Sequence, residues 1–498
     1  MTSHVKIALN TVYLTIATIV NAVLGVFRQF FIASMLDPSQ FGIWNLIRTL
    51  LGYANYGDFG ANTGVLYEAP KHSGREQYEQ AKEIRQQGFL FVLGVSIVLS
   101  FFVFSISFLP FEGINNYSMI IRLSAASILI FSLINFYNVE ARIVGNFKIL
   151  SMSMVMAGAA SLAFTVFVSI FIKENIVEWV SIAWLGGMFL SMIYLAANLR
   201  ISALIKPNLI LIRKILIVGF PLSLIPIVVV LFRTADRWVL TSMIPTIDFG
   251  YYAFGATIGM FLYTIPSVLG VVLSTRLIKK YGATSNPAAS GTMVTVSLLV
   301  SSYGMAFITG GVIISIPFLL NNFLHSYLPG EDLIKIVIVA NCTLFALPVT
   351  SNFLLSVERK KIVFVMLTLM IVLEILLTWI FGSMYGVYGG ALAVLSVSLA
   401  GGVFFLMSIF TVIKSSMNWV IFNTLKIIFP FFIFIAISLY IDDKVIMGVS
   451  VWEDLKMTML YEVYYICLAI PAALLFFWLS KTANDIKYIF KAPDSLTQ

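Results

Sequence analysis

The feature that most constrains this chain is a series of apolar stretches, each about as long as a helix that crosses a lipid bilayer. A spanning helix needs roughly 20 mostly apolar residues, and such stretches recur, for example at 9–33, 89–109, 151–172 and 179–199. Soluble domains carry about 25% charged residues, whereas this chain has 11% and a mean hydropathy of +0.98. We therefore expect lipid to surround most of the protein.

These stretches predict α-helices and not the strands of a membrane barrel. Backbone N–H and C=O groups in hydrocarbon must pair within the protein, and the alternation of apolar and polar residues typical of barrel strands is missing. The sequence predicts an all-α polytopic membrane protein with about fourteen transmembrane helices. Their expected ranges are 9–34, 41–66, 88–110, 118–141, 150–172, 178–199, 213–241, 249–274, 292–319, 333–356, 362–383, 387–412, 420–440 and 457–480.

Lysine and arginine are unevenly distributed between the two sets of connecting loops. Most of the 31 basic residues fall in alternate loops, at 71–85, 200–214, 276–280 and 359–361, and in the C-terminal tail. Because short cytoplasmic loops are enriched in these residues, both termini are expected in the cytoplasm. This topology explains the net charge of +8 without a nucleic-acid partner.

An internal repeat predicts the domain organisation. The Ser-Met and Phe-Gly pairs of 34–42 recur with the same spacing at 242–250, and a weaker match relates 135–142 to 352–360. Many transporters consist of two related halves with the substrate site between them. Each half here has six helices, so the halves share one orientation and are expected to be related by a pseudo-two-fold axis along the membrane normal. The expected parts are 1–205 and 206–415, the two six-helix halves, and 416–498, two additional helices and a cytoplasmic tail.

Charged residues inside the predicted spans are the main candidates for function. Each costs about 2.5–3.5 kcal/mol on insertion scales, so those that remain usually face a cavity or a partner. The acidic candidates for a coupling proton or sodium ion are Asp58, Asp236 and Glu374. The candidates for substrate binding are Arg28, Arg48, Arg233 and Arg237.

The alternative is that some of these charges pair with each other. Asp236 is close in sequence to Arg233 and Arg237, and outer arginines can extend to lipid headgroups. Arg28 and Arg48, however, have no carboxylate within one helical turn. They need a cross-helix partner or an anionic ligand, and a guanidinium suits a diphosphate because it donates two parallel hydrogen bonds and keeps its charge.

Prolines and absent motifs complete the prediction. Pro221, Pro226 and Pro266 fall inside the seventh and eighth predicted helices, where proline frees carbonyl groups and produces kinks, so they are candidate hinges or packing features.

The chain has no Gly-Lys pair and hence no nucleotide-binding phosphate loop. Its three histidines are scattered and form no zinc-ligand pattern. We expect no enzyme active site, no metal and no cofactor.

Three short motifs carry a resemblance to a known family. They are Phe27-Arg28 through Phe41-Gly42, the segment Gly57-Asp58-Phe59-Gly60-Ala61-Asn62-Thr63-Gly64, and Gly219-Phe220-Pro221-Leu222 followed by Asp236-Arg237. With these motifs the chain resembles the multidrug/oligosaccharidyl-lipid/polysaccharide (MOP) exporter superfamily, and within it the Wzx-type O-antigen flippases. The resemblance covers nearly all of the chain, which has two helices more than the twelve-helix members.

The resemblance implies a flippase for an undecaprenyl-diphosphate-linked oligosaccharide of O-antigen or capsule type in the bacterial plasma membrane. Family members work by alternating access around a cationic cavity lined by helices one, two, seven and eight. The implied partners are this lipid, membrane lipids and a proton or sodium gradient, with a polysaccharide polymerase and a chain-length regulator as further candidates. The alternatives are a multidrug or organic-cation antiporter, a lipid II flippase, and a multispanning glycosyltransferase or polymerase. The arginine excess argues against cation export, and the short outer loops argue against an enzyme.

Overall fold

The computed structural model describes residues 3–108, 118–201, 206–413, 417–445 and 450–479. All regular structure within these ranges is helical. The predicted end of the third helix at 109–110 and the tail after 479 lie outside them. Packing divides the chain into two compact units, residues 1–230 (unit 1) and 231–498 (unit 2). This division falls within the seventh predicted helix, and the expected halves 1–205 and 206–415 stay a prediction.

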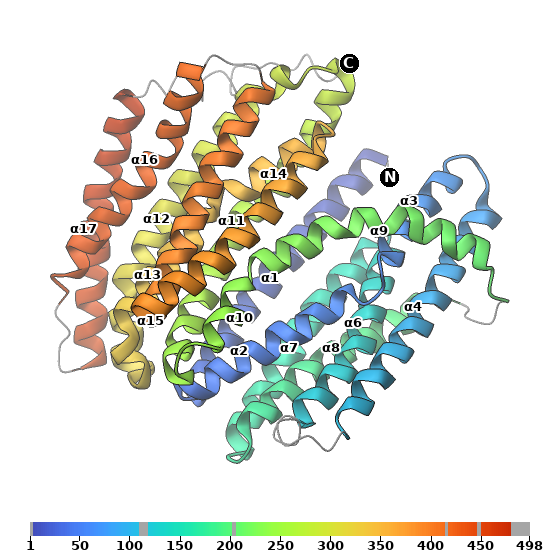
Figure 1. The fold of residues 1–498 in the computed structure, drawn as a ribbon, viewed down its shortest axis with the longest axis horizontal. Coiled ribbons are helices and arrows are strands. Elements are labelled where there is room, and N and C mark those ends of the chain that lie inside the picture. Colours follow the sequence, from blue (N-terminus) through green and yellow to red (C-terminus); the bar gives the residue numbers. More distant parts are fainter. Residues whose placement is uncertain (1–2, 109–117, 202–205, 414–416, 446–449, 480–498) are drawn as a thin grey trace. The chain divides into compact units, whose positions relative to one another are not determined.

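Unit 1 is a bundle in which α1 packs on α7, α7 on α8, and α4 on α6 (Figure 1). Its apolar core includes Val65 of α3, Ile84 of α4 and Phe136 of α6. The helices of this unit are α1 Ser3–Met35, α2 Pro38–Tyr53, η1 Ala54–Tyr56, α3 Ala61–Ser73, α4 Tyr78–Ile106, α6 Ser118–Val144, α7 Phe147–Phe171, α8 Ile176–Asn198 and most of α9 Leu209–Phe232.

Unit 2 packs α11 on α13 and α14, α10 on α15, and the last two helices on α12 (Figure 1). The two additional C-terminal helices therefore belong to this unit. Its helices are α10 Ala235–Thr241, α11 Thr246–Thr284, η2 Pro287–Ser290, α12 Gly291–Phe323, η3 His325–Gly330, α13 Glu331–Cys342, η4 Thr343–Ala346, α14 Leu347–Ser356, α15 Lys360–Val412, α16 Met417–Asp442 and α17 Val451–Leu479.

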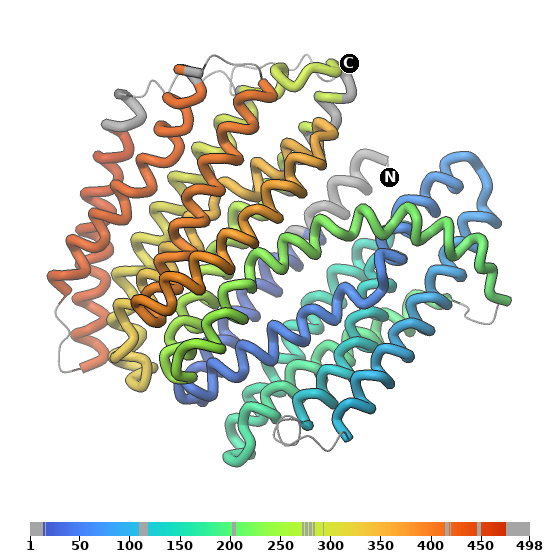
Figure 2. The backbone as a smooth tube through the Cα atoms, in the orientation of Figure 1, coloured from blue at the N-terminus to red at the C-terminus, as the bar shows by residue number. Residues whose placement is uncertain are grey.

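The long helix α15 is in fact a hairpin of two antiparallel arms, 360–385 and 387–412 (Figure 2). The chain reverses at Gly386, whose φ of 59° favours glycine. Gly401 on the second arm lies against Met370 on the first, and Ser408 Oγ is 3.4 Å from Met366 Sδ. The arms are the predicted eleventh and twelfth helices.

The predicted fold class is confirmed. Twelve helices among the described residues are long and apolar enough to cross a membrane. That number counts the α15 hairpin once and omits the second predicted helix, which is broken into α2, η1 and α3. These two differences account for the fourteen helices that the sequence predicts.

The break in the second helix allows α3 to cross α9 at van der Waals distance. Phe59 and Gly60 have φ values of 50° and 82°, so the chain turns in the left-handed region before α3 begins. A Cβ atom on Gly64 would lie 2.2 Å from the carbonyl oxygen of Ile215, and one on Gly219 would lie 2.0 Å from that of Gly60. Two of the motifs that carried the resemblance therefore meet in space because backbone packs on backbone.

We expect Gly64→Ala to destabilise the protein by about 1–3 kcal/mol, because the added methyl group must push α3 away from α9. The measurement is thermal unfolding of the purified protein in detergent. Gly94→Ala on α4 is the matched control, since a Cβ atom there meets no heavy atom within 4 Å and alanine favours a helix by about 1 kcal/mol. Equal melting temperatures for the two variants would contradict the close crossing.

Several helix boundaries differ from the predictions; for example, the predicted helix 333–356 is divided into α13, η4 and α14. The seventh predicted helix, 213–241, is interrupted at Arg233 and Thr234, between α9 and α10, whereas α9 continues through Pro221 and Pro226. The third begins at Tyr78 and not at 88, because a helix extends beyond its apolar part into the polar region. Helix α11 likewise continues through Pro266.

The earlier start of α4 places Arg85 on a helix and not in a loop. Its Nε donates a 2.8 Å hydrogen bond to Oε2 of Glu140 on α6, which is buried. Gln87, in the first half of α4, donates through Nε2 to the carbonyl oxygen of Lys206 at 2.8 Å. The loops predicted to be cytoplasmic at 71–85 and 200–214 thus meet at the same end of unit 1.

Candidate functional site

The polar cluster of unit 2 is formed by residues from three helices: Asp236 and Arg237 on α10, Tyr252 on α11 and Glu374 on α15. Asp236, Arg237 and Glu374 are only 5%, 2% and 3% exposed. They are buried because the short α10 packs against α15 and a four-residue turn leads from α10 directly into α11. The fold therefore brings together two acidic residues that the sequence singled out separately.

Hydrogen bonding and opposite charge stabilise this buried cluster. The Tyr252 hydroxyl donates a hydrogen bond to Oδ2 of Asp236. Both carboxyl groups interact electrostatically with Arg237 and with each other. Arg237 is thus the neighbouring charge that the sequence suggested for Asp236, and it offsets part of the cost of burying two acids. Arg233 lies over the ring of Tyr263, 4.4 Å from the ring centroid.

Three oxygen atoms on these helices have capacity for a ligand. Asp236 Oδ1, Glu374 Oε2 and Thr378 Oγ1 are buried and make no hydrogen bond within the described part of the chain. Thr378 follows Glu374 by one helical turn. Buried polar atoms are normally paired, and acidic groups at membrane depth typically mark proton or ion pathways. The arrangement is suited to bind and release a proton or a small cation.

The arginine candidates of unit 1 lie beside a cluster of aromatic rings. The Arg28 guanidinium on α1 is 5.8 Å from the ring centroid of Trp184 on α8, and that ring packs edge-to-face on Trp44 of α2 at 5.9 Å. Arg28 Nε is buried and has no hydrogen-bond partner among the described residues. Arg48 is half-buried, one helical turn beyond Trp44. Stacking on indole provides a favourable place for a guanidinium in an apolar span.

Asp58 has a structural reason to be buried. Its Oδ2 accepts a 2.8 Å hydrogen bond from the backbone N–H of Asn62, and its Oδ1 accepts a longer one from Gly60. These bonds satisfy the backbone N–H groups of Gly60 and Asn62 at the start of α3, which have no partner within the helix. Asp58 therefore stabilises the turn that brings α3 to α9.

Sequence reasoning did not identify the aromatic partners of the charged residues. Tyr252, Trp184 and Tyr263 are ordinary aromatic residues in apolar helices, and nothing in their spacing relates them to Asp236, Arg28 or Arg233. Thr378 was detectable, since a hydroxyl one turn after Glu374 lies on the same helix face. No group of three or more His, Cys, Asp or Glu side chains suited to a metal ion occurs within the described ranges.

The membrane-length apolar helices define a class of protein, a multi-pass membrane protein, and the solved structures that it resembles have the fold of MOP-superfamily transporters. The lipid II flippase MurJ, in an inward closed conformation, is 16% identical with a TM-score of 0.63, over 93% of this chain and 100% of that one. An inward-facing multidrug resistance MATE family transporter is 15% identical with a TM-score of 0.65, over 79% of this chain and 96% of that one. A MOP transporter from Pyrococcus furiosus, described as having a binding pocket of reverse polarity, is 15% identical with a TM-score of 0.52. The match covers 82% of this chain and 96% of that one. At such low sequence identity, these structural matches establish the fold alone.

The chain belongs to the family of polysaccharide biosynthesis proteins, whose sequence model matches residues 7–278. The superfamily predicted from the sequence is thereby confirmed. A search of curated proteins found no matching relative.

Proposed function

We propose that the protein moves an undecaprenyl-diphosphate-linked oligosaccharide, of O-antigen or capsule type, from the inner to the outer leaflet of a bacterial plasma membrane. The observation that carries the proposal is Arg28. It lies in the apolar span Ile16–Met35, and the structure records no carboxylate paired with it among the described residues. A charge kept at such cost, with an aromatic ring beside it but no paired carboxylate, favours an anionic ligand.

The chemistry of this substrate fits the residues that the spans contain. A diphosphate presents pairs of oxygens that match the planar fork of arginine, and Arg28 and Arg48 on α1 and α2 are the proposed ligands. Arg233 and Arg237 are the proposed cationic residues of unit 2. The polyprenyl tail stays in hydrocarbon during transfer, so no covalent bond has to be made or broken.

Alternating access requires a source of energy and a place to bend. We propose that proton or sodium binding at Asp236 and Glu374 supplies the energy, with Asp58 as a further candidate. The proposed hinges are Pro221 and Pro226 on α9, which precede the division between the units at 230, and Pro266 on α11. Both termini are proposed to be cytoplasmic.

The decisive experiment is depletion of the protein in its own host, followed by extraction of lipid-linked sugars. The flippase proposal expects an undecaprenyl-diphosphate oligosaccharide to accumulate, shielded from a membrane-impermeant lectin added to right-side-out vesicles. Surface polysaccharide should fall in parallel. A depleted strain in which no lipid-linked sugar accumulates would overturn the proposal.

A lipid II flippase is the second candidate, because the match to MurJ covers all of that chain. The same extraction separates the two functions. Accumulation of a peptide-bearing lipid, with cell lysis, would favour this candidate, whereas a peptide-free oligosaccharide in cells that keep their walls favours the first. Sensitivity to organic cations without any lipid accumulation would instead indicate a drug antiporter.

A further inference from the structure

A polar cavity of about 280 Å³ lies at one end of unit 1. It is formed where the end of α3 and the first turns of α4 and α9 meet. Both charged and amide side chains line it, together with apolar ones. The lining residues are His72, Gln80, Glu83, Ile84, Asn208, Ile210, Leu211 and Lys214.

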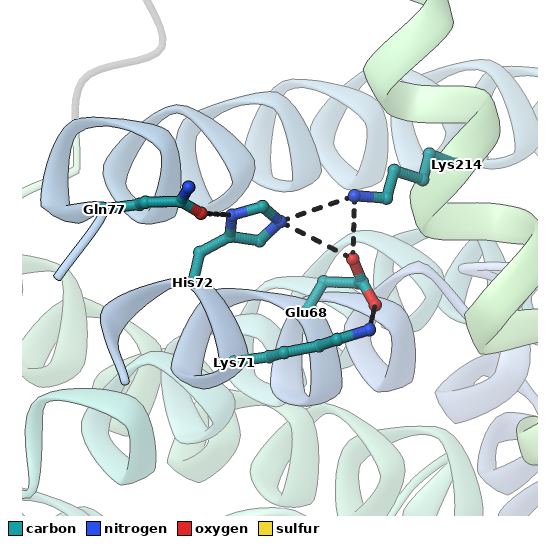
Figure 3. Close-up of polar contacts among 5 residues, drawn as sticks. All are labelled: Glu68, Lys71, His72, Gln77 and Lys214. Carbon is teal, nitrogen blue, oxygen red and sulfur yellow. Dashed lines mark hydrogen bonds and ion pairs between the residues drawn. The ribbon is translucent and has the colours of Figure 1, made fainter. Parts of the chain in front are cut away.

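Lys214 forms the basic part of this lining, and His72 lies beside it (Figure 3). The Lys214 ammonium lies 3.0 Å from Glu68 Oε2 and 3.4 Å from His72 Nε2. His72 Nδ1 is 2.7 Å from Gln77 Oε1. Since an ammonium has three N–H donors and the Lys214 side chain is 50% exposed, Lys214 is able to donate one more hydrogen bond, to a ligand in the cavity.

The charge of this part is positive in spite of Glu68. Burial alone would raise the pKa of the Glu68 carboxyl, but the hydrogen bond and charge of Lys214, together with Lys71 at 3.6 Å, hold that pKa below its ordinary value. Glu68 is therefore ionised at neutral pH, and its ion pairs are lost only as the pH falls through the lowered pKa. One carboxylate faces two lysines, so excess positive charge remains beside the cavity.

The remaining polar lining offers acceptor oxygens. Glu83 on α4 is exposed, and its Oε1 accepts a 3.2 Å hydrogen bond from Asn208 Nδ2. The backbone N–H of Asn208 donates to Gln87 Oε1 at 2.9 Å, so the start of α9 is fixed against α4. The carboxylate of Glu83 is thereby held at the cavity with free lone pairs.

We expect the cavity to lie at the depth of lipid headgroups. It is lined by the first turns of two apolar spans, Tyr78–Ile106 and Leu209–Phe232, and the ends of spans coincide with the polar layer of a bilayer. Beside it, Leu209 and Ile210 are 75% and 85% exposed. A polar cavity next to such apolar side chains suits a molecule with a charged head and a hydrocarbon tail.

We propose that this cavity binds the headgroup of an aminophospholipid of the ethanolamine type. The phosphate binds Lys214, the primary ammonium binds Glu83, and the acyl chains lie along Leu209 and Ile210. A primary ammonium donates charge-assisted hydrogen bonds to a carboxylate, which a quaternary choline is unable to do. A purely anionic headgroup gains nothing from Glu83, which repels it.

The test is native mass spectrometry of the purified full chain, reconstituted with equal amounts of phosphatidylethanolamine, phosphatidylcholine and phosphatidylglycerol. We expect phosphatidylethanolamine to be retained preferentially, and Lys214→Gln and Glu83→Gln each to reduce its retention about tenfold, as expected for loss of one charged hydrogen bond. Lys82→Gln and Glu79→Gln, on exposed positions of α4 outside the cavity, are matched controls that should retain it. Glu68→Gln leaves Lys214 charged and should also retain it, which separates binding by Lys214 from its structural pairing.

Three results would overturn the proposal. Equal retention of the three lipids would show that the cavity does not select a headgroup. If phosphatidylglycerol were retained preferentially and Glu83→Gln did not change lipid retention, the cavity would be a basic surface without selectivity for an ammonium. Displacement of the lipid by soluble phosphoethanolamine at an equal concentration would mean that the natural ligand is a soluble phosphorylated amine and not a lipid.

Discussion

Asp236→Asn and Glu374→Gln are each expected to reduce transport about tenfold or more while the protein is made at normal levels. Both substitutions keep the size of the side chain and remove its ability to exchange a proton or bind a cation. Coupling between two ligands typically amounts to about 1–3 kcal/mol, or a factor of about 5–150 in affinity, so loss of the coupling ion is expected to have an effect of this order. The measurement is the fraction of lipid-linked oligosaccharide that reaches the outer leaflet of proteoliposomes under an imposed proton or sodium gradient.

Glu462→Gln provides the matched control for these two variants. Glu462 is also an acidic residue within an apolar span of unit 2, but it lies on α17 and accepts a 2.9 Å hydrogen bond from Ser315. Its replacement should leave coupled transport unchanged. Tyr252→Phe removes one hydrogen-bond donor to Asp236. Its transport rate should lie between those of the wild type and Asp236→Asn. Gradient-driven transport at the wild-type rate in both Asp236→Asn and Glu374→Gln would exclude this cluster as the coupling site.

Arg28→Ala is expected to lower surface polysaccharide to about one-tenth of the wild-type amount or less, with the lipid-linked precursor accumulating inside. The substitution removes a charged donor pair for the diphosphate, and each such bond is worth about 1.5–3 kcal/mol. Arg28→Lys should restore only part of the activity, because an ammonium lacks the planar fork. Arg48→Ala should also lower the amount of surface polysaccharide.

The control for Arg28 is Arg122→Ala on α6. Arg122 also stacks on an aromatic ring, with its guanidinium 5.2 Å from the centroid of Phe108, but it is exposed at the end of its span. Its loss should not affect polysaccharide export. Normal surface polysaccharide in Arg28→Ala cells, at normal protein levels, would refute the diphosphate assignment.

The helices were predictable from the sequence because hydrocarbon permits few alternatives. A stretch such as 151–172 has to become a helix when water is absent, and α7 spans Phe147–Phe171 as a result. The break at Phe59 and Gly60 was not predictable in the same way. It depends on tertiary contact with α9 at Gly219, and an apolar run contains no local signal for such a crossing.

The candidate site was predictable residue by residue but not as an arrangement. The cost of buried charge identified Asp236 and Glu374 independently, although the two residues are far apart in the chain. Their proximity arises because α10 packs on an arm of the α15 hairpin, and the contribution of Tyr252 requires α11 to fold back beside α10. Single-residue energetics identifies the members of such a cluster, whereas packing decides which members meet.

The stacking of Arg28 on Trp184 provides the protein with an intrinsic optical reporter. An indole emits according to the polarity and charge around it, so a ligand that draws the guanidinium away from the ring should change both the intensity and the wavelength of Trp184 emission. The chain contains eight tryptophans, and replacing the other seven with phenylalanine would isolate this signal. Occupancy of the arginine site would then be measurable by fluorescence in a detergent micelle, without labelling the lipid.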